Sequence, residues 1–253
     1  VKRIPTPNGE NTGDILAQLE HITANNKVAG FVYEPLVQGA AAMKMHDKNG
    51  LELILSFCKK HQIITVADEV MTGFGKTGTY FASQQLEIKP DIMCLSKALT
   101  AGLLPMAITS CSLEIYDAFY SDDIAKGLFH GHTYSANPLA CTAAIAGIEL
   151  LTSTDMQSNI KRVIASHKSF GEHIKQHEKV SSTRQSGVIF ALDLNVKMER
   201  YGNLRDKLFK FFMDQGVFLR PLGSTIYILA PYTISKIQLD KIYNTIESAL
   251  EII

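Results

Sequence analysis

Residues 63–68, Ile-Ile-Thr-Val-Ala-Asp, decide the fold class of this chain. The run of apolar and β-branched residues predicts a strand buried on both faces, and Asp68 stands where that strand should end. Directly before it, residues 50–60 carry apolar side chains at helical spacing and lysines in the last turn. A further apolar run, 28–33, precedes this helix. A strand, a helix and a strand in this order predict a parallel sheet with crossover helices, and therefore an α/β fold.

Further apolar runs at 91–95 and 106–111 extend the predicted sheet. A long helical stretch follows, with Asn137 as its N-cap and Pro138 at its first position, where a missing N–H costs nothing. Beyond it the pattern predicts a helix at 155–177, strands at 187–194, 217–220 and 225–229, and helices at 203–215 and 235–251. We therefore expect a mostly parallel sheet with helices on both faces in residues 1–152, and a small α+β domain in residues 153–253.

Composition excludes several classes of function. Among the 253 residues, 25 Lys and Arg balance 25 Asp and Glu, which gives no electrostatic reason to expect nucleic acid or an anionic membrane as a partner. No apolar stretch approaches the ~20 residues that span a bilayer, and the N-terminus resembles neither a signal peptide nor a transit peptide. The four cysteines form no Cys-x-x-Cys pair, so we expect reduced core residues in a cytoplasmic protein. They are Cys58, Cys94, Cys111 and Cys141.

A glycine-rich segment, Gly73-Phe-Gly-Lys-Thr-Gly78, matches two phosphate-binding patterns only in part. A P-loop requires a glycine five positions before Gly75, where Val70 stands. A dinucleotide-binding fingerprint opens directly from a strand into a helix, but residues 68–72 intervene. We therefore interpret the segment as a loop whose glycines allow a close approach of backbone.

Asp68 and Lys97 are the candidates for chemistry. Each follows a predicted strand, and their separation of 97 − 68 = 29 residues leaves room for one crossover. We expect both at one edge of the sheet, where open α/β sheets bind ligands. A lysine in a partly desolvated pocket can form a Schiff base, and a carboxylate facing a pyridine nitrogen keeps that nitrogen protonated. From the residues alone, Asp68 could equally cap a neighbouring element while Lys97 reaches solvent.

The chain resembles class III (ω-) aminotransferases in four blocks that have the order and spacing of that family. The blocks are EPLVQG at 34–39, ADEVMTGFGKTG at 67–78, LSKAL at 95–99 and GHTYSANP at 131–138. The resemblance continues to the C-terminus. It implies fold type I of the pyridoxal-phosphate-dependent transferases, with part of the large domain followed by the small C-terminal domain. It also implies pyridoxal 5′-phosphate as cofactor, transamination as activity and a homodimer as the assembly.

The resemblance assigns roles to four residues of this sequence. Asp68 would pair with the pyridinium nitrogen and Val70 would pack on the ring face. Lys97 would hold the cofactor covalently and move a proton during transfer. Thr133 would bind the cofactor phosphate across the dimer interface, in the partner's site.

Residues 38–45, 216–223 and 226–232 are most similar to the family members that aminate 8-amino-7-oxononanoate from S-adenosylmethionine in biotin synthesis. This similarity implies that Arg220 binds the substrate carboxylate, a role suited to a planar, bidentate donor. Lys76 stands where these members typically carry arginine, so its contact is expected to shape the choice of donor. Tyr134 is a candidate for lining the substrate channel or for filling core. Another amine donor (ornithine, a diamine or β-alanine type) and a non-catalytic module stay open as alternatives.

Two further expectations concern absences. His130 and His132 lie two positions apart without a nearby third ligand, and we expect no metal site there. Chains of the resembled family normally begin well before this one does. We therefore expect a fragment without the glycine/serine turn that cups the phosphate and without an aromatic ring partner, and we expect it to be inactive alone.

Overall fold

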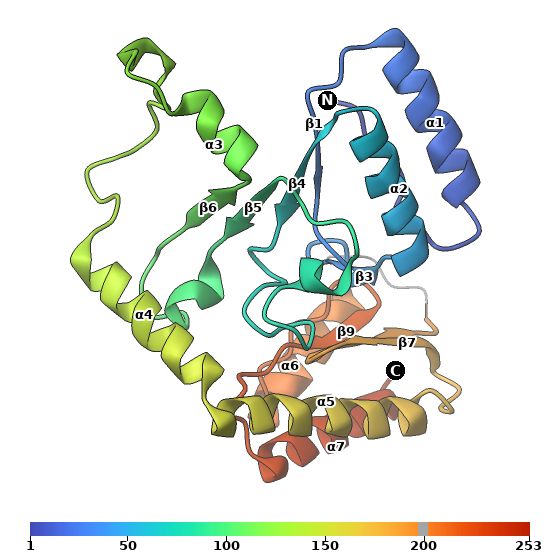
Figure 1. Cartoon of the computed structure of the whole chain (residues 1–253). Helices are drawn as coiled ribbons and strands as arrows, with labels where there is room; N and C mark the ends of the chain where they lie inside the picture. Colours follow the sequence, from blue (N-terminus) through green and yellow to red (C-terminus); the bar gives the residue numbers. More distant parts are fainter. Residues whose placement is uncertain (197–201) are drawn as a thin grey trace. The chain divides into compact units, whose positions relative to one another are not determined.

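The computed structural model describes residues 1–196 and 202–253 (Figure 1). Contacts divide the chain into two compact units, each made of segments that are not contiguous in sequence. Unit 1 contains Val1–Val37, His46–Phe74 and Thr79–Leu151, and unit 2 contains Gln38–Met45, Gly75–Gly78 and Thr152–Ile253. The division after Leu151 lies next to the boundary predicted from the sequence, but two short earlier segments also belong to unit 2.

Unit 1 is built on a four-stranded sheet in the order β1-β4-β5-β6. β1 (Gly30–Tyr33), β4 (Ile64–Asp68) and β5 (Ile92–Leu95) run parallel to one another, whereas β6 (Ile108–Cys111) pairs antiparallel with β5. The predicted mostly parallel sheet is therefore confirmed. Its helices are α1 (Thr12–Asn25), α2 (Lys48–Lys60), α3 (Leu113–Phe119) and α4 (Pro138–Thr152), and its 3₁₀ turns are η1 (Ala82–Gln85), η2 (Lys97–Thr100) and η3 (Ile124–Lys126).

The starts of two helices in unit 1 follow from their capping residues. Asp47 accepts a hydrogen bond from the backbone N–H of Gly50 at 2.6 Å and so caps α2. Asn137 Oδ1 accepts from the Ala140 N–H at 2.9 Å, which confirms the predicted cap before Pro138. The sequence reading did not identify α1 or α3.

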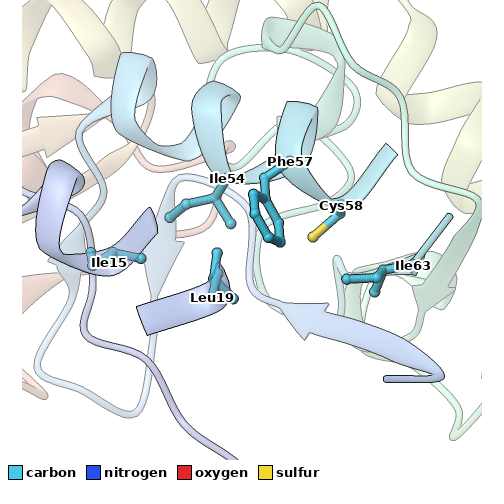
Figure 2. Close-up of a cluster of buried hydrophobic side chains, with 6 residues drawn as sticks. All are labelled: Ile15, Leu19, Ile54, Phe57, Cys58 and Ile63. Atoms are coloured by element: carbon cyan, nitrogen blue, oxygen red, sulfur yellow. The ribbon is translucent and has the colours of Figure 1, made fainter. Parts of the chain in front are cut away.

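The apolar face of α2 packs against α1 (Figure 2). A buried cluster of side chains forms this contact. Each aliphatic or aromatic member contributes roughly 1.5–3 kcal/mol when it leaves water, so the packing fixes α1 and α2 beside the start of β4. The buried cluster consists of Ile15 and Leu19 from α1, Ile54, Phe57 and Cys58 from α2, and Ile63 before β4.

The cysteines are all free, but they do not all lie in the core. Cys58 is buried, as expected, and Cys94 and Cys141 are partly buried. Cys111 is exposed because it lies in β6, an edge strand whose four residues are all exposed in the described chain. The expectation of a core position is therefore wrong for Cys111.

Unit 2 is built on a three-stranded antiparallel sheet in the order β7-β8-β9. Its strands are β7 (Val180–Ser186), β8 (Ile189–Leu194) and β9 (Thr225–Ile228), and its helices are α5 (Thr154–Ile174), α6 (Asn203–Asp214) and α7 (Lys236–Leu250). Two shorter strands, β2 (Val37–Gln38) and β3 (Lys44–Met45), pair with each other.

Two strand predictions in unit 2 need correction. Residues 217–220 are not a strand, although their burial alternates between inside and outside. Alternation gives a segment two faces, but a strand also needs a neighbouring backbone to bond with, and the sheet order places none beside it. Conversely, β7 was not predicted, because Val-Ser-Ser-Thr-Arg-Gln-Ser is polar at most positions.

Within the described ranges no single helix is both long and apolar enough to cross a membrane. The pair α4 and α5 meets such a test of length and composition only when the two helices are taken together.

Candidate functional site

Asp68 and Lys97 lie at the same edge of the sheet in unit 1. Asp68 is the last residue of β4 and is in register with Cys94 of the parallel strand β5. The Glu69 N–H donates to the Cys94 carbonyl at 3.0 Å, which continues the pairing one step beyond the strand. Lys97 follows Cys94 by three residues and begins η2. Because β4 and β5 are parallel, their carboxyl ends meet, and the expected position of both residues at one sheet edge is confirmed.

The Asp68 carboxylate is partly buried and is oriented by its own loop. Its Oδ1 accepts a hydrogen bond from the Val70 N–H at 3.0 Å, a short loop in which an aspartate bonds the backbone two residues on. No other hydrogen bond to Asp68 occurs within residues 1–196 and 202–253. Oδ2 is therefore available to a ligand that carries an N–H group. Val70 is itself partly buried beside this loop.

Lys97 has a left-handed backbone with φ 45°. This conformation costs a non-glycine residue about 1–3 kcal/mol and persists only where neighbouring contacts fix it. The Ser96 hydroxyl donates to the Met106 carbonyl at 2.7 Å, and the Thr100 hydroxyl donates to the Leu104 carbonyl at 2.5 Å. These contacts close the loop that follows β5 and hold the backbone on which Lys97 stands.

Lys97 is exposed in the described chain. The physical reason is the short 3₁₀ turn. It directs Leu99 and Thr100 inward, at 3% and 1% exposure, and leaves Lys97 outside.

Glu69 is a site residue that sequence reasoning missed. It is fully buried, and its carboxylate accepts from the Ser83 N–H at 2.7 Å, the Ala82 N–H at 2.9 Å and the Thr72 hydroxyl at 2.8 Å. The only sequence signal is its place directly after Asp68, since its backbone donors lie 13 and 14 residues away.

Thr133 and Tyr134 lie in an exposed turn of unit 1, and no hydrogen bond of the described residues links them to Asp68 or Lys97. His132 organises this turn. Its Nδ1 accepts from the Tyr134 N–H at 3.1 Å, and its own N–H donates to the Ser135 hydroxyl at 3.0 Å. His132 thus has a structural role, and the described residues contain no group of three or more potential metal ligands.

The glycine-rich segment Gly73–Gly78 does not lead into an α-helix, because the next helical element is the short turn η1 at residues 82–85. Within unit 2, the backbone of Gly187 approaches the backbone of residues 76–78 closely. A Cβ on Gly187 would lie 2.2 Å from the carbonyl carbon of Thr77, and Gly187 has φ 58°. The Val188 N–H then donates to the Lys76 carbonyl at 2.9 Å. The predicted close approach of backbone is therefore confirmed.

Lys76 is held over an aromatic ring in unit 2. Its Nζ lies 4.4 Å from the centroid of the Tyr232 ring, the geometry of a cation–π contact. Burial lowers the pKa of Lys76 to about 8, because a charged amine loses its hydration there, and burial likewise raises the pKa of Tyr232. Arg220, also in unit 2, is exposed and forms no ion pair within the described residues.

A family model described as aminotransferase class-III matches residues 3–250. Adenosylmethionine-8-amino-7-oxononanoate aminotransferase of Synechococcus elongatus is 40% identical over 239 residues, which cover 93% of this chain and 55% of the relative. The enzyme of the same name from Geobacter sulfurreducens is 35% identical, with 94% and 54% covered. The chain spans about half the length of the curated relatives it matches.

Solved structures give the same result. The crystal structure of adenosylmethionine-8-amino-7-oxononanoate aminotransferase from Methanocaldococcus jannaschii aligns with a TM-score of 0.80 at 30% identity, covering 87% of this chain and 53% of that one. An amine transaminase from an uncultivated Pseudomonas species, in its PLP-bound form, aligns with a TM-score of 0.85 at 29% identity, covering 94% and 56%. The predicted fold type I is thereby confirmed, and the chain belongs to the class III aminotransferases.

Proposed function

We propose that this protein transfers an amino group from S-adenosylmethionine to 8-amino-7-oxononanoate with pyridoxal 5′-phosphate as cofactor, giving 7,8-diaminononanoate in biotin synthesis. One observation carries the chemistry: adjacent parallel strands bring Asp68 and Lys97 to one sheet edge. The names of the curated relatives, several at 31–40% identity, support the choice of substrates.

The residues at this edge fit pyridoxal phosphate. A pyridine ring needs a carboxylate beside its nitrogen, and Asp68 keeps Oδ2 open while Oδ1 is held by the Val70 N–H. An aldehyde needs an accessible amine, and the exposed Lys97 provides one on a backbone that its loop fixes. The donor set is therefore that of a cofactor-binding lysine with a carboxylate opposite the ring nitrogen.

Each residue at the edge has one task in this proposal. Pyridoxal phosphate supplies the electron sink that makes the carbon next to the amine acidic. Asp68 keeps a proton on the ring nitrogen through its carboxylate, and Val70 packs against the ring. Lys97 Nζ would hold the cofactor and would carry the proton from the substrate carbon that bears the amine to the cofactor.

The proposal also gives roles to four further residues, two in each unit. Arg220 binds the substrate carboxylate, and its exposed guanidinium, which forms no ion pair in the described chain, supports this role. Lys76 adds a second positive charge that influences the choice of donor. Tyr134 lines the substrate channel, and Thr133 binds the cofactor phosphate in the site of a partner subunit. The exposure of Thr133 and Tyr134 supports roles that face outward from their own unit.

A homodimer is part of the proposal. Unit 1 exposes large apolar side chains along residues 113–145, as surfaces that form subunit contacts do. They include Leu113, Tyr120, Ile124, Leu128, Phe129, Tyr134, Leu139 and Ile145. We also place the protein in the cytoplasm, a proposal that the four free cysteines support.

A second candidate function is transamination of another amine, of the ornithine, diamine or β-alanine type. The structures of the amine transaminase and of an ω-transaminase from Thermomicrobium roseum favour it, with TM-scores of 0.85 and 0.86. A donor screen separates the two candidates. Turnover with S-adenosylmethionine supports the first, and turnover with diamines or β-alanine alone supports the second.

The decisive experiment is to incubate the protein with pyridoxal phosphate, reduce with borohydride and map the modified peptide by mass spectrometry. We expect a pyridoxyl group on Lys97 alone. Because the chain spans about half the length of its relatives, the experiment is repeated with the N-terminal half of the Synechococcus elongatus relative added. Scattered modification of surface lysines in both arms would overturn the aminotransferase proposal and favour a non-catalytic module.

A further inference from the structure

Glu69 is a buried carboxylate whose hydrogen bonds all come from uncharged donors. Its exposure is 0%, yet no Lys or Arg of the described residues pairs with it. Instead, Oε1 accepts from the Ser83 N–H, and Oε2 accepts from the Ala82 N–H and the Thr72 hydroxyl. Moving a charged or polar group out of water is unfavourable unless such bonds replace its hydration.

The backbone of Glu69 is bonded as completely as its side chain. Its N–H donates to the Cys94 carbonyl at 3.0 Å, and its carbonyl accepts from the Gly73 N–H at 2.9 Å. The approach of Gly73 is close, since a Cβ there would lie 2.8 Å from the Glu69 carbonyl oxygen. One residue therefore ties together the ends of β4 and β5, the turn at residues 69–73 and the start of η1.

Asp68, in contrast, is held through a single hydrogen bond, from the Val70 N–H to Oδ1 at 3.0 Å. The position of that N–H depends on the turn at residues 69–73. Glu69 begins this turn and holds its far end, through its carboxylate to the Thr72 hydroxyl and through its carbonyl to the Gly73 N–H. The direction of the Asp68 carboxylate therefore depends, through the Val70 N–H, on contacts that Glu69 makes.

We propose that Glu69 is a positioning residue: its buried carboxylate fixes the turn that aims Asp68 and Val70 at the cofactor. The inference rests on the proposed role of Asp68. A residue that only stabilised the fold would change the resistance of the protein to unfolding and leave the direction of Asp68 as it is.

The test compares Glu69→Gln with Glu52→Gln. Glutamine has the size of glutamate, but its NH₂ group would face a backbone N–H of Ala82 or Ser83, so one contact would become donor against donor. Glu52 is the matched control in the same unit. Its carboxylate also accepts from two backbone N–H groups, those of Glu87 at 2.5 Å and Ile88 at 3.4 Å, but it is not fully buried, and among the described residues it forms no hydrogen bond with the 69–73 turn.

The first readout needs no cofactor. Amide hydrogen exchange of the Val70 N–H is measured in the cofactor-free protein, where we expect about tenfold faster exchange in Glu69→Gln and no change in Glu52→Gln. The comparison is made under conditions in which both variants are folded by circular dichroism. An unchanged Val70 rate in folded Glu69→Gln would overturn the inference, whatever the fate of the proposed function.

The second readout uses protein loaded with pyridoxal phosphate, after the wild type has given its adduct on Lys97. A nearby charge moves a pKa by about 1–3 units, so partial displacement of Asp68 should move the pH midpoint of the cofactor absorbance by about half a unit. kcat should fall about 10- to 100-fold, as when an outer partner of a reacting group is lost, with little change in KM. A loss of stability alone would move neither the midpoint nor the kcat of the folded enzyme.

Thr72→Val provides a variant that keeps the charge of Glu69 if Glu69→Gln does not fold. It removes one hydroxyl donor and leaves both backbone donors in place. We expect the same changes in Val70 exchange and absorbance midpoint, smaller in size. Wild-type values of both quantities in folded Thr72→Val would contradict the proposal.

Discussion

Two carboxylates of this chain, Glu69 in unit 1 and Asp193 in unit 2, each join segments that are distant in sequence, but they do so by different means. Glu69 is fully buried and accepts only from uncharged donors. The Asp193 side chain is 29% exposed and pairs with Arg184 at 2.5 Å, with further bonds from the hydroxyls of Thr225 and Ser182.

The second arrangement has an evident structural purpose. Arg184 also donates to the carbonyls of Ala42 at 2.6 Å and Met43 at 2.8 Å, two residues with left-handed φ angles of 60° and 54°. The Arg184–Asp193 pair therefore holds a strained segment against the sheet of unit 2. The difference teaches that a fully hydrogen-bonded carboxylate can either stabilise the fold or orient a neighbouring side chain. Changes near Glu69 should act on activity and changes at Asp193 on stability.

Of the changes expected to act on activity, Lys97→Ala should have the largest effect. We expect turnover to fall by about 10⁴-fold or more, as on loss of a covalent catalyst, because no other amine holds the cofactor. Mass spectrometry after borohydride reduction should show no specific adduct. Lys59→Ala, which removes an exposed lysine at the end of α2, is the control and should behave as wild type. Retained turnover in Lys97→Ala would refute the assignment.

Asp68→Asn should reduce kcat by about 10²- to 10³-fold, the size usual for loss of one preorganised electrostatic contact. The asparagine Oδ1 can still accept from the Val70 N–H, so the turn and the unfolding midpoint should stay close to wild type. Steady-state kinetics and urea unfolding on the same preparation measure both quantities. A variant that lost stability while keeping its kcat would reverse the comparison.

Asp193→Asn should cost about 2 kcal/mol in the free energy of unfolding at neutral pH, with kcat of the folded protein unchanged. Burial alone would raise the pKa of Asp193, but hydrogen bonds from Arg184, Thr225 and Ser182 outweigh burial and lower it. This stabilisation is therefore complete above the unfolded pKa of about 3.9 and is lost as pH falls through the lower folded pKa. Urea unfolding at several acidic pH values should show this loss in wild type and not in Asp193→Asn.

Lys76→Arg should have the smallest effect. Lys76 differs from Glu69 and Asp193 because it is a cation, and it lies over the Tyr232 ring. The charge of Lys76 is lost as pH rises through its pKa of about 8, so KM for an anionic substrate should rise a few-fold above that pH. Arginine stays charged throughout, and the KM of Lys76→Arg should stay flat. A similar rise in both proteins would exclude Lys76 from substrate binding.

The sequence predicts the sheet edge well because its signals are local. A continuous apolar run ends at Asp68, and the 29-residue interval to Lys97 leaves room for one crossover, so the meeting of the two residues follows from strand geometry. The exposure of Lys97 could not be predicted, because it depends on which side chains a 3₁₀ turn directs inward.

Features that depend on contacts between distant segments escaped the sequence reading. Glu69 is recognised only once Ala82 and Ser83 are brought to it. β7 is polar because its stability comes from the ladder with β8 and from Arg184, not from an apolar face. Residues 217–220 show the reverse, an alternating pattern without a partner strand.

The passage of the chain between the two units at 37/38, 45/46, 74/75, 78/79 and 151/152 has a consequence for how the protein can be divided. A protease cut after Leu151 would not release two intact bodies. The N-terminal product would retain Gln38–Met45 and Gly75–Gly78, which belong to unit 2, and the C-terminal product would lack the Ala42 and Met43 carbonyls that Arg184 binds. Neither unit is therefore a module that can be exchanged by a single splice.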